Sequence, residues 1–523
     1  MRILWISEAP YLNTGYAVYT KNVLSYLSSL PDFEIIQLGV YAEEGDNRNY
    51  NYPWRIIPNQ PNTNVPEYKS SEINAFGAWK FDEICSQFKP DVVCNIGDLW
   101  MFEFILRSPY AKYFNTVIMP TCDSEPQPRQ WVEIYSKIDK VLAYNDWSRK
   151  ELEYRGLTNV VGTAPPVADS KFYPYDHMKR LRVRSQMGFG NEVIFGTVMR
   201  NQARKLFPQL FNAFREFLNY GKAKLICHTS FPDKGWDIPQ LLKRYNLSSQ
   251  VLFTYKCSKC EAFSLDSFKS CIKECPRCRH VSSKLCNVES GIDTDQLCSI
   301  YNLMDLYLQP CTNEGFGMPL CEAAACGVPI AATNYSAPED ILNKLNGYKL
   351  DYVRSCNVTD NIDKAVVSVE SITNVMREIY NTPKEVLNKK RLETRRLFES
   401  EYGTWEKTSR VWENVIGQAG RGRWDAPLDI QSSERPQNIT SAYDMSKFLI
   451  ENTLKENKLY TLMHARLIRD LSLGFVKKTM GGEYEHEYVG CQMAHDKITA
   501  EEFANVFENR RLLINEAERR RSS

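Results

Sequence analysis

Residues 310–329 read PCTNEGFGMPLCEAAACGVP, and this stretch says most about the fold. The apolar run Leu306–Gln309 before it predicts a strand, and a helix is predicted to begin near Met318, with a proline in its first turn where a missing N–H is harmless. Gly315 and Gly317 let the connecting loop turn sharply and approach a ligand closely. The free backbone N–H groups at such a helix start suit a phosphate.

The same alternation of apolar strands and helices extends along most of the chain. It predicts an α/β protein with two doubly wound, Rossmann-like parallel sheets, covered on both faces and separated by a crevice. A Pro- and Ala-rich stretch, Gly162–Asp176, is the predicted linker. The predicted strands are Arg2–Ser7, Phe33–Val40, Asp91–Ile96 and Thr116–Pro120 in the first series, and Val193–Met199, Lys224–His228, Val251–Tyr255, Leu306–Gln309 and Pro329–Ala332 in the second; the first helix is predicted over Val18–Leu30.

Composition excludes several classes of protein. The chain has 523 residues, and its 65 Lys and Arg against 64 Asp and Glu leave a net charge of +1, so no global basic excess indicates nucleic acid or an anionic membrane. No apolar run approaches the roughly 20 residues of a membrane helix, and Glu8 cuts short the apolar start. The scattered single cysteines are typical of a reducing compartment, so we expect a cytoplasmic protein.

Six of the 16 cysteines crowd into residues 257–286. Cys257 and Cys260 form one Cys-x2-Cys knuckle, and Cys275 and Cys278 form a second one. Fourteen residues separate the two knuckles. Four thiolates at this spacing complete a tetrahedral shell, so the segment predicts a structural zinc ribbon without an open coordination position. The alternative is a set of unligated buried thiols.

The acidic loop also carries a resemblance. Glu314 and Glu322, with Leu297–Asp305 before them and Ala331–Asp340 after, resemble the Glu-x7-Glu signature of retaining glycosyltransferases of the family 4 type, which have the GT-B fold. The resemblance implies that Glu314 lies against the donor sugar and that Glu322 accepts hydrogen bonds from the nucleotide ribose. It further implies that the loop offers backbone amides to the sugar and the diphosphate, from Gly315, Phe316 and Gly317. The alternative is a helix start whose glutamates are ordinary caps.

The family also implies a pair of cations. Arg200 and Lys205 follow a predicted strand at the spacing at which family members grip the donor diphosphate, and two fixed cations stabilise the charge that develops on this leaving group. They stand where other transferases place a divalent ion, so no catalytic metal is expected. Arg204 makes the assignment less clear-cut, and a solvated basic helix start is the alternative.

Three weaker candidates complete the predicted site. Gly15 lies in a loop that family members close over the donor, although a simple strand–helix turn explains it equally well. Asp123 lies near the position where many members carry a histidine, and with Asp98 it is a candidate for the acceptor side. His228 ends a strand near the expected nucleotide, where a buried core histidine is the alternative.

The resemblance implies sugar transfer from a nucleoside diphosphate donor to a hydroxyl with retention, by a hexosyl- or pentosyltransferase. A UDP-sugar is favoured and a GDP-sugar is possible. The zinc insert resembles that of glycosyltransferases of tailed phages and other large DNA viruses, which would place the protein in the host cytoplasm with a hydroxymethylated pyrimidine in viral DNA as acceptor. A glycan, lipid-linked or protein acceptor is the alternative, as is a non-catalytic nucleotide-sugar-binding scaffold.

These expectations divide the chain as follows. We predict an acceptor-side domain over 1–165, a nucleotide-sugar domain over 175–385 with the ribbon 257–286 inside it, helices over 386–418 that pack back across the domains, and a mostly helical extension of unknown role over 419–523.

Overall fold

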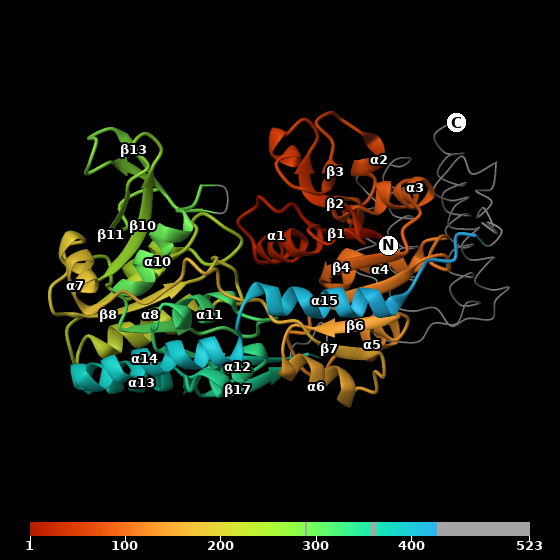
Figure 1. Cartoon of the computed structure of the whole chain (residues 1–523). Coiled ribbons are helices and arrows are strands. Elements are labelled where there is room, and N and C mark those ends of the chain that lie inside the picture. The colour runs from red at the N-terminus through yellow and green to blue at the C-terminus, as the bar shows by residue number, and fades with distance from the viewer. Residues whose placement is uncertain (288–289, 357–361, 426–523) are drawn as a thin grey trace, which may run out of the picture. The chain divides into compact units, whose positions relative to one another are not determined.

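The computed structural model describes residues 1–287, 290–356 and 362–425. Two mainly parallel sheets, each covered by helices, make up its framework, which confirms the predicted α/β class (Figure 1). We call the part around the first sheet the N-lobe and the part around the second sheet the C-lobe. β7 ends at Thr163 and β8 begins at Val193, so the predicted domain boundary, which remains a prediction, falls between the two sheets.

The N-lobe sheet has the order β3-β2-β1-β4-β5-β6-β7, with all neighbours parallel. Alternate residues of β1 are buried in separate clusters: Ile3 and Trp5 on one face, Leu4 and Ile6 on the other. Both faces of the sheet are therefore covered, as its continuous apolar strands require. The strands are β1 (Arg2–Glu8), β2 (Glu34–Glu43), β3 (Arg55–Gln60), β4 (Val92–Gly97), β5 (Asn115–Pro120), β6 (Lys140–Ala143) and β7 (Val160–Thr163).

The helical segments of the N-lobe lie between these strands. They are α1 (Gly15–Leu27), η1 (Asn47–Tyr50), α2 (Pro66–Lys69), η2 (Glu72–Phe76), α3 (Ala78–Phe88), α4 (Leu99–Arg107), α5 (Arg129–Tyr135) and α6 (Asp146–Tyr154). Helix α1 begins three residues before the predicted Val18, because the Thr14 side chain caps it by accepting a hydrogen bond from the Ala17 N–H at 3.3 Å.

The C-lobe sheet has the order β12-β13-β10-β9-β8-β14-β15-β16, with β11 also paired to β10. Its strands are β8 (Val193–Val198), β9 (Ala223–His228), β10 (Val251–Cys257), β11 (Phe263–Ser267), β12 (Ile272–Glu274), β13 (Val281–Leu285), β14 (Leu306–Gln309), β15 (Ile330–Thr333) and β16 (Tyr348–Leu350), and β17 (Tyr352–Cys356) pairs separately with β18 (Asp363–Val367). Its helices are α7 (His177–Gln186), α8 (Phe207–Phe217), α9 (Ile238–Arg244), α10 (Thr294–Leu303), α11 (Met318–Ala325), α12 (Ala337–Leu345), α13 (Val369–Asn381) and α14 (Lys384–Glu401).

The cysteine-rich insert is an extension of this sheet. Strand β10 runs without a break from the parallel sheet to Cys257, while β11 and β13 pair with it in antiparallel fashion on either side. The insert projects from the C-lobe beyond the parallel strands (Figure 1). The ribbon is thus joined to the sheet by backbone hydrogen bonds along a shared strand.

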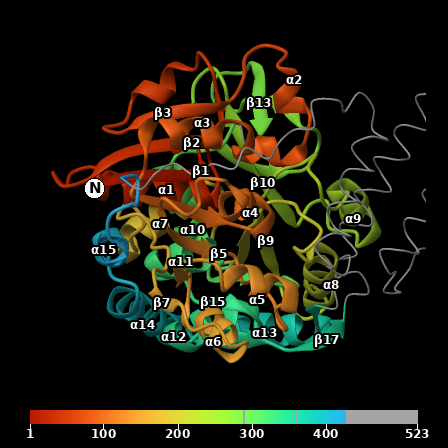
Figure 2. The same ribbon diagram turned by 90° about the vertical axis from the view of Figure 1, so that its right-hand side faces the viewer.

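Helix α15 (Trp405–Ala419) crosses back to the N-lobe and lies along α1 (Figures 1 and 2). The indole of Trp412 is fully buried, with its ring centroid 4.7 Å from that of Trp5, and its Nε1–H donates to the Tyr19 hydroxyl at 2.7 Å. Beyond α15, the Gly422 N–H donates to Asp91 at 3.0 Å. The N-lobe therefore contains the first part of the chain, up to β7, together with residues 405–422 from beyond the C-lobe.

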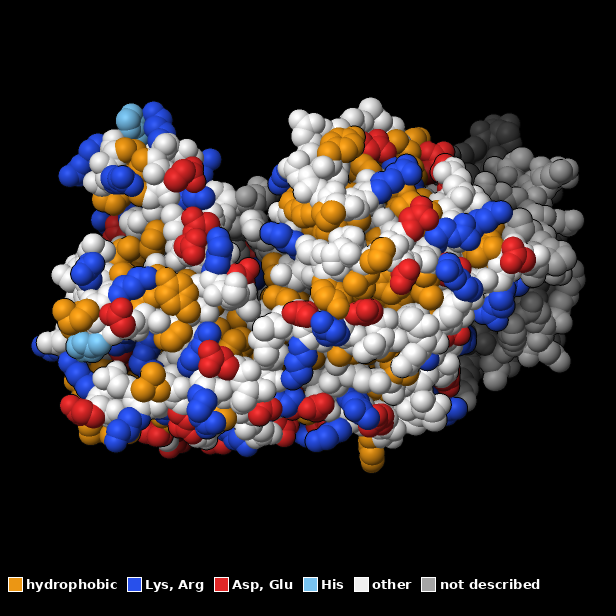
Figure 3. Space-filling view, viewed as in Figure 1, with side chains coloured by type: hydrophobic (Ala, Val, Ile, Leu, Met, Phe, Trp, Pro, Cys, Tyr) orange, Lys and Arg blue, Asp and Glu red, His pale blue; other side chains and the backbone are white. Residues whose placement is uncertain are grey.

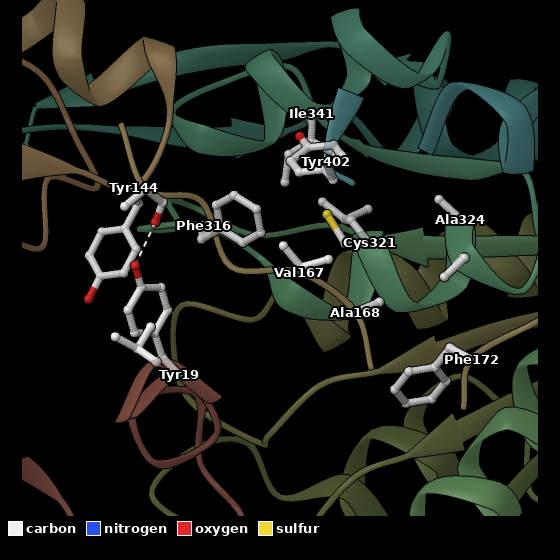
Figure 4. Packing of buried hydrophobic residues seen from close by; sticks show 14 of the residues in the cluster. Tyr19, Tyr144, Val167, Ala168, Phe172, Phe316, Cys321, Ala324, Ile341 and Tyr402 are labelled. Atoms are coloured by element: carbon white, nitrogen blue, oxygen red, sulfur yellow. Dashed lines mark hydrogen bonds between the residues drawn. The ribbon is translucent and has the colours of Figure 1, made fainter. Parts of the chain in front are cut away.

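One buried cluster joins the lobes (Figure 4). It contains Tyr19 and Tyr144 of the N-lobe, Val167 of the linker, and Phe316 and Cys321 of the C-lobe. Such shared apolar packing holds the strand ends of one lobe against those of the other.

No helix in the described ranges is long and apolar enough to cross a membrane. The predicted extension over 419–523 lies outside the described residues from residue 426 onward.

Candidate functional site

The acidic loop connects β14 to α11, as the sequence predicts. Gly317 has φ +102°, and an added Cβ would lie 2.9 Å from the Gln309 amide nitrogen, so only glycine fits there. The Phe316 ring is buried against Tyr402, with centroids 6.0 Å apart, which leaves only the backbone of Phe316 for a ligand. Pro319 stands in the first turn of α11, and the helix begins facing the N-lobe.

Glu314 is the centre of the charged groups in this loop. It is only 5% exposed, and its backbone N–H donates to Ser336 Oγ at 3.1 Å. Lys205 Nζ pairs with one carboxylate oxygen, and Arg204 Nη1 lies 2.5 Å from the other. A buried carboxylate thus holds two cations.

Backbone pairing brings those cations to Glu314. The segment after β8 runs beside the acidic loop, where the Thr312 N–H donates to the Arg204 carbonyl at 2.9 Å and the Leu206 N–H donates to the Pro310 carbonyl at 3.2 Å. Burial and the adjacent Arg204 guanidinium lower the pKa of the Lys205 ammonium, so its charge depends on an anionic neighbour.

Arg200, the other predicted cation, lies apart from Glu314. Its guanidinium makes two hydrogen bonds to Asp233, at 2.9 and 3.1 Å, and its side chain is 43% exposed. The structure therefore brings Arg204, rather than Arg200, together with Lys205 and Glu314.

Glu322 lies in α11 and His228 at the end of β9, both in the C-lobe. The Tyr301 hydroxyl donates to Glu322 Oε2 at 2.6 Å, and burial raises the pKa of Glu322 to about 7. Burial also lowers the pKa of His228 to about 4, which keeps the imidazole neutral at pH 7. Its Nδ1 is buried and has no hydrogen-bond partner among the described residues.

The N-lobe meets the acidic loop through its own strand ends. A Cβ on Gly15 would lie 3.6 Å from Met318 Sδ, so the start of α1 faces the start of α11. A Cβ on Gly315 would lie 2.6 Å from Thr121 Cγ2, and Asn145 Nδ2 donates to the Gly315 carbonyl at 3.1 Å. The two predicted glycines thus lie where the N-lobe contacts the C-lobe.

Two carboxylates of the N-lobe end the strands beside this loop. Asp123 accepts a hydrogen bond from Asn313 Nδ2, across the lobes. Asp98 accepts one from the Tyr16 hydroxyl at 3.3 Å, and burial, reinforced by the charge of Asp123, raises the pKa of Asp98. Asp123 therefore contacts the acidic loop at Asn313, the residue before Glu314.

The sequence interpretation gave no role to Asn313 or Asn145, and it named Arg204 only as a complication beside Lys205. Asn313 could have been found as the polar neighbour of Glu314, and Arg204 as the neighbour of Lys205. Asn145 could not, because it follows β6, a four-residue strand too short to recognise.

The four predicted zinc ligands come together. The Sγ atoms of Cys257, Cys260, Cys275 and Cys278 all lie within 4.8 Å of one another, with 3.6 Å between Cys257 and Cys278 and 3.7 Å between Cys260 and Cys275. Four sulfurs this close fit the tetrahedral shell of a single zinc ion with Zn–S distances of about 2.3 Å.

Comparison with known proteins agrees with this geometry. Residues 284–370, which contain the acidic loop, match the family model described as glycosyl transferases group 1. The D-inositol 3-phosphate glycosyltransferase of Corynebacterium jeikeium is 26% identical over 248 residues, which are 45% of this chain and 51% of that protein. The chain spans about half, or much less, of the length of the curated relatives that it matches.

Solved structures resemble most of the described chain. Sucrose-phosphate synthase from Thermosynechococcus elongatus has a TM-score of 0.59 at 15% identity, covering 80% of this chain and 98% of that one. Anabaena HepE, in complex with UDP and glucose, has a TM-score of 0.58 at 11% identity, covering 80% of this chain and 100% of that one. The chain therefore has the α/β GT-B-like fold of glycosyltransferases. Within that fold, its C-lobe carries the segment that is similar to the group 1 enzymes.

Proposed function

We propose that the protein is a glycosyltransferase that moves a sugar from a nucleoside diphosphate donor to an acceptor hydroxyl. The observation that carries the proposal is Glu314, buried between Lys205 and Arg204 in the loop before α11, a helix whose first residue, Met318, faces Gly15 of the N-lobe. Cations fixed beside a helix start suit a diphosphate leaving group, and an adjacent carboxylate suits sugar hydroxyls.

In the proposed reaction, the acceptor oxygen forms a bond to the anomeric carbon as the bond from that carbon to the diphosphate breaks. We propose attack from the same face, with retention, so that the departing diphosphate oxygen takes the acceptor proton. Lys205 and Arg200 stabilise the charge on the diphosphate, Glu314 orients the sugar, and Glu322 and His228 face the nucleoside. Asp123 is the proposed acceptor-side group, since it lies beside the acidic loop.

A UDP-sugar is the favoured donor, because the similar Anabaena protein was solved with UDP and glucose. A GDP-sugar remains the second choice. No catalytic metal enters this scheme, because the proposed cations neutralise the diphosphate.

For the acceptor we propose a hydroxymethylated pyrimidine in DNA of a phage or another large DNA virus. The ribbon supports this choice: Lys259, Arg277 and Lys284 are exposed, and none of them has an ion pair within the described ranges. Lys and Arg side chains gather at the projecting ribbon in Figure 3, beside the hollow between the lobes. Phosphate contacts of this kind make binding depend steeply on salt.

We also propose that Cys257, Cys260, Cys275 and Cys278 bind one structural zinc ion. Because four thiolates fill its shell, the ion would stabilise the ribbon and leave no position for an activated water.

A donor screen tests the proposal. UDP- and GDP-sugars are incubated with the protein, alone and with hydroxymethylated duplex DNA, a glycan or a lipid-linked acceptor, and nucleotide release and acceptor mass are measured. Glu314→Ala should abolish turnover, whereas Glu370→Ala, on the exposed face of α13, should not change it.

The outcomes separate the alternatives. Transfer of sugar to DNA that is lost at higher salt supports the DNA acceptor. Transfer to a glycan or lipid-linked acceptor instead would overturn the DNA proposal in favour of that acceptor. Nucleotide binding without turnover on any donor would contradict the enzyme and favour a binding scaffold.

A further inference from the structure

The two cations on Glu314 hold it in different ways. Arg204 Nη1 reaches both the Glu314 carboxylate and, at 3.3 Å, the Asn313 carbonyl, so its planar guanidinium is fixed at two points of the acidic loop. Lys205 meets Glu314 through a single ammonium, at the end of a flexible stem. The lysine side chain is 8% exposed and the arginine side chain 38%.

An incoming diphosphate creates a conflict at this site. Lys205 is the cation proposed to grip the diphosphate, yet in the structure its charge is satisfied by Glu314. If Lys205 were the one cation on Glu314, moving it to a phosphate would leave a buried carboxylate unpaired, which is strongly unfavourable. Arg204 removes the conflict, because it stays on Glu314 when Lys205 leaves.

We propose that Arg204 is a positioning residue that keeps Glu314 paired and thereby releases Lys205 to bind the donor diphosphate. This inference rests on the proposed function, since it concerns the same donor site. In the glycosyltransferase resemblance the assigned cations are Arg200 and Lys205, and neither that pattern nor the matched family segment, residues 284–370, assigns a role to Arg204.

The inference predicts an unusual pattern of binding. Without Arg204, Lys205 must stay with Glu314, and diphosphate affinity falls. If Glu314 is then made neutral, Lys205 is free again and affinity returns. A direct contact between Arg204 and the phosphate would give no such recovery.

The test measures the Kd of UDP by calorimetry for the full chain and four variants, with melting curves to verify folding. Arg204→Gln should weaken UDP binding about 30-fold, while Glu314→Gln and the double variant should bind within about threefold of the wild type. Arg215→Gln, exposed on α8, is the matched control and should bind normally.

Each result decides something. A double variant as weak as Arg204→Gln, or an Arg204→Gln protein that binds like the wild type, overturns the role of Arg204 while leaving the proposed function intact. A wild-type protein that binds neither UDP nor GDP overturns the proposed function and this inference together.

Discussion

The approach of Gly315 to Thr121 allows a sharp test of how closely the lobes must meet. A Cβ on Gly315 would lie 2.6 Å from Thr121 Cγ2, whereas ordinary contact begins near 3.4 Å, so Gly315→Ala must push the acidic loop away by about 0.8 Å. Overpacking of this kind costs about 1–3 kcal/mol of stability. In the proposed reaction, misplacing this loop by nearly 1 Å is expected to lower kcat about 100-fold.

Thr121→Ser supplies the matched rescue. It removes the clashing methyl group and keeps the hydroxyl, which lies 2.7 Å from the Tyr16 hydroxyl. We expect Thr121→Ser alone to be nearly neutral and the double variant Gly315→Ala/Thr121→Ser to regain most of the lost kcat, measured by nucleotide release. Full activity in Gly315→Ala, or no recovery in the double variant, would refute the idea that this contact sets the position of the loop.

Three further predictions concern metal, stability and pH. Zinc analysis by atomic emission should find about one zinc per wild-type chain and a loss of zinc in Cys257→Ser, with a lower Tm; wild-type protein free of zinc would contradict the site. Trp412→Ala should lower the free energy of unfolding in urea by about 3–5 kcal/mol, because it empties a fully buried site between α15 and the N-lobe, and a loss below about 1 kcal/mol would show that α15 is dispensable. The pKa of Glu322 is raised from 4.5 to about 7, so between these pH values the folded state binds a proton that the unfolded state has lost. The free energy of unfolding of the wild type should therefore fall as pH rises from 4.5 to above 7, by up to about 3 kcal/mol relative to Glu322→Gln. Parallel denaturation curves at pH 5 and pH 8 that do not differ between the two proteins would exclude this effect.

Long apolar runs were the reliable guide to the fold. β14 has the bounds predicted for it, and β1, β5 and β9 differ by only one residue, since strands buried on both faces read as continuous apolar stretches. β3 was missed because Pro58 and two polar residues interrupt its apolar pattern, and β7 because it is short and contains a glycine.

The site was predictable only where the residues are close in sequence. Glu314, Gly315 and Gly317 belong to one loop, so their spacing already fixes their arrangement. The pairing of Arg204 with Glu314 and that of Asn313 with Asp123 join residues about 110 and 190 positions apart, and only the fold brings them together. The family resemblance pointed to Arg200, and the ion pair of Arg200 with Asp233 could not be foreseen from the sequence.

The return of α15 to the N-lobe also bears on synthesis. Trp5 and Tyr19 are synthesised about four hundred residues before Trp412, the tryptophan that covers them. Until some four hundred residues have been translated, this apolar surface has no lasting cover, and the C-lobe must be made in the meantime. Nascent chains halted before Trp405 should accordingly be the ones that chaperones retain and proteases cut.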